Sequence, residues 1–264
     1  MSSDAARESE GRIEALMPYS RARMPEGTAV DTCEAAIRDW ILSGEVSPGE
    51  RLPPERRLAE RLGVNRTTLR GALSRLASAR LLTVRQGSGY VVQDYRRVAG
   101  LELLPEVVAL AEARGDGIGP IVKDLLEVRR RLATMALERF VDHPRPGAAD
   151  RVEAAVDRFA ELMGSSPTEE EVVDADLAVI GEFLEASGSA VLGLCLNPIS
   201  FVVQSLAPLR TALYVDPDTN VAAYRLLVLW MRSPSRDAIA RVAEQLERRD
   251  AETVARVTRA AGEG

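Results

Sequence analysis

Arginine and threonine side chains occur together where the sequence reads GVNRTTLRGALSRL, beginning at Gly63. Arg66 and Arg70 lie four positions apart, about one turn of an α-helix, and Thr67 and Thr68 lie between them. Arginine binds guanine through O6 and N7, while threonine binds phosphate or contacts the thymine methyl group. The pattern therefore predicts a helix whose first turns face the base edges of the DNA major groove.

Four further residues complete the predicted DNA-binding set. Arg56 lies near the start of the preceding predicted helix, where it can reach a phosphate with the help of the helix dipole. Asn65 immediately precedes the arginine-threonine segment and is a favourable N-cap. Gln86 and Gly87 lie at the glycine-rich tip of a predicted hairpin and are expected to approach the minor groove or the DNA backbone. The alternative interpretation is a solvated basic surface with no DNA partner.

Charge is distributed unevenly along the chain. Between Arg56 and Arg85 there are eight arginines and one acid, Glu60, which gives this segment a net charge of +7. The whole chain carries −6, so the remainder carries −13. Such asymmetry is typical of a basic DNA-binding domain joined to an acidic one.

Helical and strand patterns surround these residues. Apolar periodicity predicts a first helix that ends at Gly44, a short second helix that Pro54 opens and Gly63 closes, and a third helix capped by Asn65. The buried face of the third helix is predicted to comprise Leu69, Leu73 and Leu76. The segment LLTVRQGSGYVV then predicts two short strands. Three helices followed by a hairpin form a winged helix-turn-helix.

The pattern changes on either side of this unit. Residues 1–27 are polar and are predicted to be a flexible extension, and the winged helix-turn-helix is predicted over residues 28–95. Residues 96–264 contain successive amphipathic helical patterns, one of which is AVLGLCLNPISFVVQSLAPL. Part of it, NPISFVVQSLAPL, is a candidate for a dimer surface or for the core. The predicted fold class is mainly α, with an all-α helical bundle for effector binding and dimerisation after the winged unit.

Several classes of function are disfavoured. The chain has one histidine, His143, in a proline-rich loop pattern, and its two cysteines, Cys33 and Cys195, show no metal spacing. No nucleophile elbow or phosphate-binding loop is present, which argues against an enzyme. No apolar run is long enough to cross a bilayer, and the N-terminal residues are polar and acidic, unlike a secretory signal. We therefore expect a cytoplasmic protein with no metal, cofactor or membrane partner.

Two longer motifs connect the predicted DNA-binding residues to a known family. Pro-Gly-x-x-Leu-Pro-x-Glu-Arg-x-Leu-Ala begins at Pro48, and Val-x-Arg-x-Thr-x-Arg-x-Ala-Leu begins at Val64. Both closely resemble the DNA-binding domain of the GntR family of bacterial transcription regulators. The resemblance implies three main DNA-contacting arginines and three supporting residues, which are Arg56, Arg66, Arg70, Thr67, Thr68 and Gly87. Asn65 stands where many members have serine or threonine.

The all-α second domain resembles that of the FadR subfamily. Its larger branch holds a metal through one aspartate and three histidines, and the aspartate of that motif aligns with Asp176. The histidine positions align with Ile180, with Tyr224 and with a position near Arg248, so the resemblance implies no metal site. The spacing is closer to the fatty-acid-responsive FadR regulators, which lack those histidines and bind long-chain acyl-CoA.

Arg129 matches an arginine that faces the effector pocket in those regulators, and Asp176 and Tyr224 complete the candidate effector-binding set. An arginine on an apolar helix face suits a carboxylate, thioester or phosphate. The alternative is an internal salt bridge with an acid such as Asp176 or Glu182. Three positions of the resembling pocket hold Glu247, Asp250 and Val254 here. Acids at such positions would repel CoA phosphates, and the neighbouring Arg248 and Arg249 are candidates to offset that repulsion.

The resemblance implies a ligand-responsive regulator that binds a palindromic operator on double-stranded DNA as a homodimer. Binding of a small acid or acyl-CoA in the helical domain would release or rearrange the DNA-binding domains. The alternative is a constitutive DNA-binding protein whose helical domain is filled and takes no ligand.

Overall fold

The computed structural model describes residues 28–85 and 89–262. The chain forms two compact units whose boundary falls between Leu103 and Leu104. The predicted mainly α fold class, with a winged helix-turn-helix followed by an all-helical domain, is confirmed.

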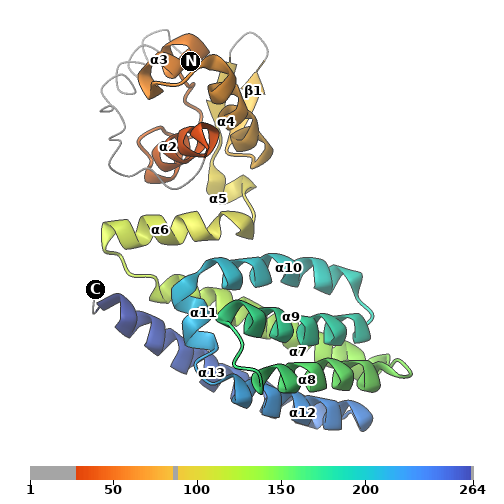
Figure 1. Cartoon of the computed structure of the whole chain (residues 1–264). Coiled ribbons are helices and arrows are strands. Elements are labelled where there is room, and N and C mark those ends of the chain that lie inside the picture. Colours follow the sequence, from red (N-terminus) through yellow and green to blue (C-terminus); the bar gives the residue numbers. More distant parts are fainter. Residues whose placement is uncertain (1–27, 86–88, 263–264) are drawn as a thin grey trace. The chain divides into compact units, whose positions relative to one another are not determined.

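Within the described residues, the N-terminal unit has three full helices, two short helical turns and a two-stranded antiparallel sheet (Figure 1). Its elements are α2 (Ala29–Ser43), α3 (Glu55–Leu62), α4 (Arg66–Ser78), β1 (Leu82–Arg85), β2 (Gly89–Val92), a single helical turn α5 (Tyr95–Val98) and a 3-10 turn (Leu101–Leu103). Helix α4 packs against α2, α3 and β1. The hairpin pairs Leu82 with Val92 and Arg85 with Gly89, and Arg51 forms an additional antiparallel bridge to Val91.

Local signals explain the helix boundaries. Thr28 caps α2 through a capping box with Asp31, and Gly44 ends the helix in the left-handed region with φ 81°. Asn65 caps α4 by accepting a 2.8 Å hydrogen bond from the backbone N–H of Thr68, as predicted. The predicted apolar face of α4 is fully buried, and it comprises Leu69, Leu73 and Leu76.

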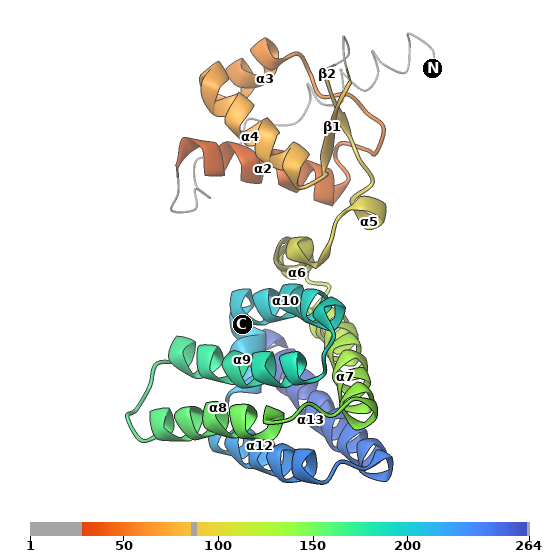
Figure 2. The same cartoon turned by 90° about the vertical axis from the view of Figure 1, so that its right-hand side faces the viewer.

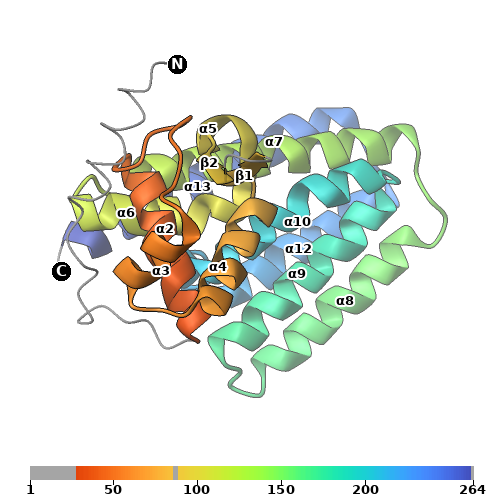
Figure 3. The same cartoon turned by 90° about the horizontal axis from the view of Figure 1, so that it is seen from above.

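The C-terminal unit is entirely helical within the described residues. Its helices are α6 (Leu104–Arg114), α7 (Gly119–Asp142), α8 (Ala148–Met163), α9 (Glu169–Ala186), α10 (Ala190–Ser205), α11 (Ala207–Leu213), α12 (Pro217–Arg232) and α13 (Arg236–Gly262). Helices α10, α9, α8 and α12 lie side by side in that order (Figure 2). The long helices α7 and α13 pack against each other along one side of this layer (Figure 3).

One predicted helical pattern is two helices. The segment AVLGLCLNPISFVVQSLAPL breaks at Leu206, where α10 ends and α11 begins with a bend of 99°. Pro208 lies in the first turn of α11, where its missing N–H leaves no intrahelical hydrogen bond unmade. The pattern is partly core, since Ile199, Val202 and Val203 are buried whereas Phe201 is exposed.

Candidate DNA interface and helical-domain site

Helix α4 presents its predicted DNA-reading side chains to solvent. Arg66, Thr67 and Arg70 are exposed, and Thr68 is half-buried. The side chain of Arg66 makes no hydrogen bond or ion pair with any other residue that the structure describes. Its guanidinium is therefore available to an external anion or base edge. Gln86 and Gly87, the predicted hairpin-tip residues, lie outside the described residues.

The other two predicted DNA-contacting arginines are paired with carboxylates. Arg70 donates from Nε to Oε2 of Glu55 on α3, at 2.8 Å. This hydrogen bond, together with the charge of Glu55, raises the pKa of Arg70 above its ordinary value. Arg56 contacts Glu60 one turn further along the same helix, at 3.1 Å, and both side chains are well exposed. An exposed pair of this kind is weak and dissociates readily.

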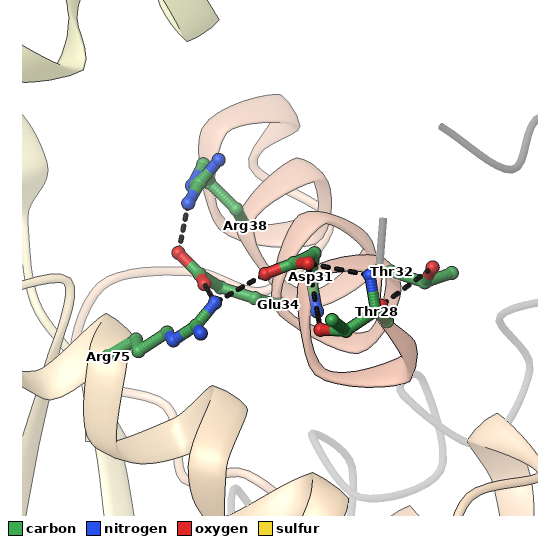
Figure 4. A network of polar contacts seen from close by, with 6 residues as sticks. All are labelled: Thr28, Asp31, Thr32, Glu34, Arg38 and Arg75. Carbon is green, nitrogen blue, oxygen red and sulfur yellow. Dashed lines mark hydrogen bonds and ion pairs between the residues drawn. The ribbon is translucent and has the colours of Figure 1, made fainter. Parts of the chain in front are cut away.

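Arg75, in the last turn of α4, connects the recognition helix to α2 (Figure 4). Its Nη1 atom lies 2.5 Å from Oδ1 of Asp31 and 3.3 Å from Oε2 of Glu34, which also pairs with Arg38. Hydrogen bonds from Thr28 and from Arg75 hold the pKa of Asp31 at about 2. This arginine therefore positions α4, whereas Arg66 and Arg70 lie on the part of the helix that can meet DNA.

The interior of the helical unit contains a buried carboxylate held by two phenols. Asp176 on α9 accepts a 2.8 Å hydrogen bond at Oδ1 from the hydroxyl of Tyr224 on α12, and one at Oδ2 from the hydroxyl of Tyr214. Burial raises the pKa of Asp176, against the opposing effects of both phenols and of Arg129 and Arg249. Burial also raises the pKa of both tyrosines. The predicted residues Asp176 and Tyr224 are thus in direct contact.

Arg129 forms an internal salt bridge, but not with Asp176 or Glu182 as the alternative interpretation expected. Its Nη2 atom donates to Oδ1 of Asp250 on α13 at 2.9 Å, and Nη1 of Arg130 donates to Oδ2 at 2.5 Å. Asp250 is buried, and each of its two oxygens is paired with a guanidinium group, which compensates for the loss of solvent. The carboxylate that was expected to repel an acidic effector instead neutralises the arginine that was expected to attract one.

Sequence reasoning missed Tyr214 as a member of this cluster. Its hydroxyl occupies the second oxygen of Asp176, and its only signal in the sequence was its place ten positions before Tyr224 in the segment YVDPDTNVAAYR. Arg248 is exposed, whereas Arg249 is half-buried, donates to Oδ1 of Asn220 and acts electrostatically on Asp176.

A cavity of about 400 Å³ adjoins the cluster. Tyr214 both lines the cavity and donates to Oδ2 of Asp176, so this one side chain contacts both. The other lining residues are Met163, Pro167, Glu169, Val172, Pro217 and Asp218. Glu169 is engaged by Arg210 and Thr211, which lower its pKa.

Within residues 28–85 and 89–262, no group of three or more His, Cys, Asp or Glu side chains is arranged to hold a metal ion. In the same part of the chain, no single helix is long and apolar enough to cross a membrane, although α10 and α11 together, with the 99° bend between them, are long and apolar enough.

Comparison with known proteins places this architecture in a family. Residues 29–92 match the family described as bacterial regulatory proteins, gntR family. The HTH-type transcriptional regulator Mce2R of Mycobacterium tuberculosis is 44% identical over 129 residues, which cover 47% of this chain and 50% of that protein. The chain thus spans about half the length of that relative. Another M. tuberculosis HTH-type regulator, Rv0494, is 33% identical over 216 residues, covering 80% and 81% of the two chains.

Two other comparisons extend into the helical unit. The fatty acid metabolism regulator protein of Edwardsiella ictaluri is 33% identical over 182 residues, which cover 67% of this chain and 68% of that protein. The solved structure titled "Lar controls the expression of the Listeria monocytogenes agr system and mediates virulence" superposes with a TM-score of 0.51 at 15% identity, covering 89% and 99% of the chains, and supports the fold alone. The chain belongs to the GntR family of bacterial DNA-binding transcription regulators, which are not enzymes.

Proposed function

We propose that the chain acts in the cytoplasm as a homodimer that binds a palindromic operator and responds to an organic acid or acyl-CoA held in the helical unit. In each subunit, α4 would enter the major groove of one half-site, with Arg66, Arg70 and Thr67 at the base edges. Arg56, Thr68, Asn65 and the hairpin tip, with Gln86 and Gly87, would contact phosphates or the minor groove.

The likeness to the fatty acid metabolism regulators supports the choice of effector. The aligned 182 residues far exceed the residues that match the DNA-binding family, so the likeness includes much of the helical unit. A regulator named for fatty acid metabolism suggests an acyl-CoA or a related acid as the ligand of this unit. The carboxylate, thioester or phosphate of such a ligand is a natural partner for guanidinium groups.

The observation that carries the effector proposal is the buried cluster around Asp250 and Asp176. Arg129 and Arg130 on α7 hold α13 through Asp250, so an anion that competes for these guanidiniums would alter the contact between the two helices. Buried charged groups are costly unless each is paired, so such a cluster has few stable arrangements. A ligand that favours a second arrangement would shift the placement of the DNA-binding units.

A second candidate is a constitutive regulator with a helical unit that takes no ligand. The same contacts favour it in one respect: both oxygens of Asp176 and both oxygens of Asp250 already have partners within the chain. An internal carboxylate then permanently fills the position that an acidic effector would take.

A DNA-binding titration separates the two candidates. The full chain is titrated onto a fluorescent duplex from its own upstream region, with and without palmitoyl-CoA, and with free CoA and palmitate as controls. Release of the duplex at micromolar palmitoyl-CoA supports the ligand-responsive candidate. Unchanged DNA binding and an unchanged melting temperature with all three compounds favour the constitutive candidate.

Two alanine variants on α7 test whether the response to palmitoyl-CoA depends on the buried cluster. Arg129→Ala removes a half-buried guanidinium of the cluster, whereas Arg131→Ala removes an exposed one that pairs only along α7 with Glu127. Effector binding through the cluster predicts that the first variant loses the palmitoyl-CoA response and that the second keeps it, provided that both bind DNA without ligand. An intact response in Arg129→Ala would place the effector elsewhere.

A further inference from the structure

We propose that Glu55 is a positioning residue that sets the base preference of Arg70. Glu55 is the first residue of α3, and Arg70 lies on α4, 15 positions later. The bond between Arg70 Nε and Glu55 Oε2 is 2.8 Å long and joins the two helices of the helix-turn-helix. The inference rests on the proposed contact of Arg70 with a base edge.

The bond engages one particular part of the guanidinium. A guanidinium can bind guanine O6 and N7 either through its two terminal nitrogens or through Nε and one terminal nitrogen. Because Glu55 accepts from Nε, it blocks the second mode and leaves the two terminal nitrogens free. The Arg70 side chain is 68% exposed, so without Glu55 little else would restrict its rotamers. Glu55 therefore favours a single, end-on geometry.

The other two predicted DNA-contacting arginines, Arg66 and Arg56, are not held by an acid of a neighbouring helix among the described residues. The Arg66 side chain has no hydrogen-bond or ion-pair partner among the residues that the structure describes, and the acid that pairs with Arg56 lies on the same helix as Arg56 itself. Glu60 therefore cannot orient a side chain of α4 as Glu55 does. The base pair that Arg70 reads should depend on Glu55, and the base pair that Arg66 reads should not.

The charge of Glu55 has a second effect, which acts on all DNA sequences. A carboxylate close to the groove repels phosphates whatever the sequence, and its repulsion is offset best where Arg70 gains a full pair of hydrogen bonds to guanine. Removing the carboxylate should thus raise affinity for unrelated DNA while lowering discrimination at one base pair. A residue that only supported the fold would instead weaken binding to every sequence when removed.

The experiment measures base preference with a randomised duplex library. The full-length wild type, Glu55→Ala, Glu55→Gln, Arg66→Ala and Arg70→Ala each select duplexes, and the bound fraction is sequenced. Glu60→Gln is the matched control, since it removes a carboxylate from the same helix. We expect Glu55→Ala to lower discrimination about threefold to tenfold at the position relaxed by Arg70→Ala, a part of the full arginine–guanine contribution. Discrimination at the position relaxed by Arg66→Ala should stay unchanged.

The outcomes separate this inference from the proposed function. A wild type that selects no motif, or an Arg70→Ala variant with the wild-type motif, contradicts the proposed DNA-reading role and the inference with it. If the wild-type motif depends on Arg70 but not on Glu55, the inference is overturned and the proposed function stands. The same holds if Glu55→Ala lowers base discrimination equally at all positions. Glu55→Gln removes the charge but keeps the size of the side chain, and it replaces Glu55→Ala in the measurement if the alanine variant does not fold. In an Arg70→Ala background, either Glu55 substitution should cause no further loss of preference.

Discussion

The hydroxyl of Tyr224 donates a 2.8 Å hydrogen bond to Oδ1 of Asp176, and so joins α12 to α9 inside the helical unit. Tyr214 occupies the second oxygen in the same way. A protonated phenol is a donor, and burial raises the pKa of both tyrosines, so neither favours the phenolate form that would bind a cation. Both oxygens of Asp176 are therefore occupied by hydrogen-bond donors, which leaves this carboxylate poorly placed to bind a cation.

This arrangement predicts that chelators have no effect. Incubation of the purified protein with excess EDTA should change neither its melting temperature nor its affinity for the operator duplex. Added Zn²⁺ or Ni²⁺, after the chelator is removed, should not raise the melting temperature, because one carboxylate is a poor site for either ion. Loss of stability with EDTA that Zn²⁺ restores would contradict this reading of the cluster.

Asp250 is predicted to stabilise the helical unit. Asp250→Ala removes the buried carboxylate that the half-buried guanidiniums of Arg129 and Arg130 share, and we expect a loss of about 2–4 kcal/mol in the free energy of unfolding. Glu247→Gln is the control, because Glu247 is 69% exposed and lies 3.7 Å from Arg130. Its effect should stay below about 0.5 kcal/mol. Urea unfolding of both variants checks the difference, and equal effects would mean that the Asp250 pairs add nothing to stability.

The ion pair between Asp31 and Arg75 predicts that the stability of the N-terminal unit depends on pH. Because the pKa of Asp31 is lowered from 3.8 to about 2 in the folded chain, its contribution is present above pH 3.8 and is lost as the pH falls towards 2. Asp31→Asn should therefore destabilise the N-terminal unit near neutral pH, and the difference from wild type should shrink through that window. Denaturant unfolding at several pH values checks this. A difference that is constant with pH would show that the charge of Asp31 is not involved.

Local sequence signals were sufficient to predict the helix ends and the buried helix face in the N-terminal unit. The cap at Asn65, the end at Gly44 and the apolar spacing of α4 each act within one or two helical turns, so the sequence alone predicted them correctly. In the helical unit, the periodicity predicted the all-α class but missed the break at Leu206, because α10 remains helical through one proline, Pro198, and stops before the next.

The polar contacts of the helical unit were harder to predict for a physical reason. Arg129 and Asp250 are 121 positions apart and meet only because α7 packs against α13, which no local pattern specifies. Arg129 was singled out as a charge on an apolar face, and its internal salt bridge is with Asp250 and not with Asp176 or Glu182, the acids named as examples. The bond between Glu55 and Arg70 spans fewer positions, yet it too depends on the crossing of two helices and not on their sequence patterns.

Alanine variants of three arginines on α4 should show that two of them read DNA and that the third supports the fold. Arg66→Ala and Arg70→Ala should each weaken binding to the operator duplex by about 5-fold to 150-fold and relax base preference, with little change in melting temperature. Arg75→Ala should act in the opposite way, because its guanidinium is engaged by Asp31 and Glu34 on α2. It should lower the melting temperature while retaining the base preference of wild type.

Binding to a scrambled duplex at two salt concentrations completes the test of this division. Loss of a phosphate contact lowers the salt dependence of binding to all sequences. Loss of a base contact instead narrows the gap in affinity between operator and scrambled DNA. Arg66→Ala and Arg70→Ala should narrow that gap, and Arg75→Ala should preserve it at temperatures where the variant is folded. If Arg75→Ala narrowed the gap as much as Arg70→Ala, the last turn of α4 would also read bases, and its contacts with α2 would have to break when DNA binds.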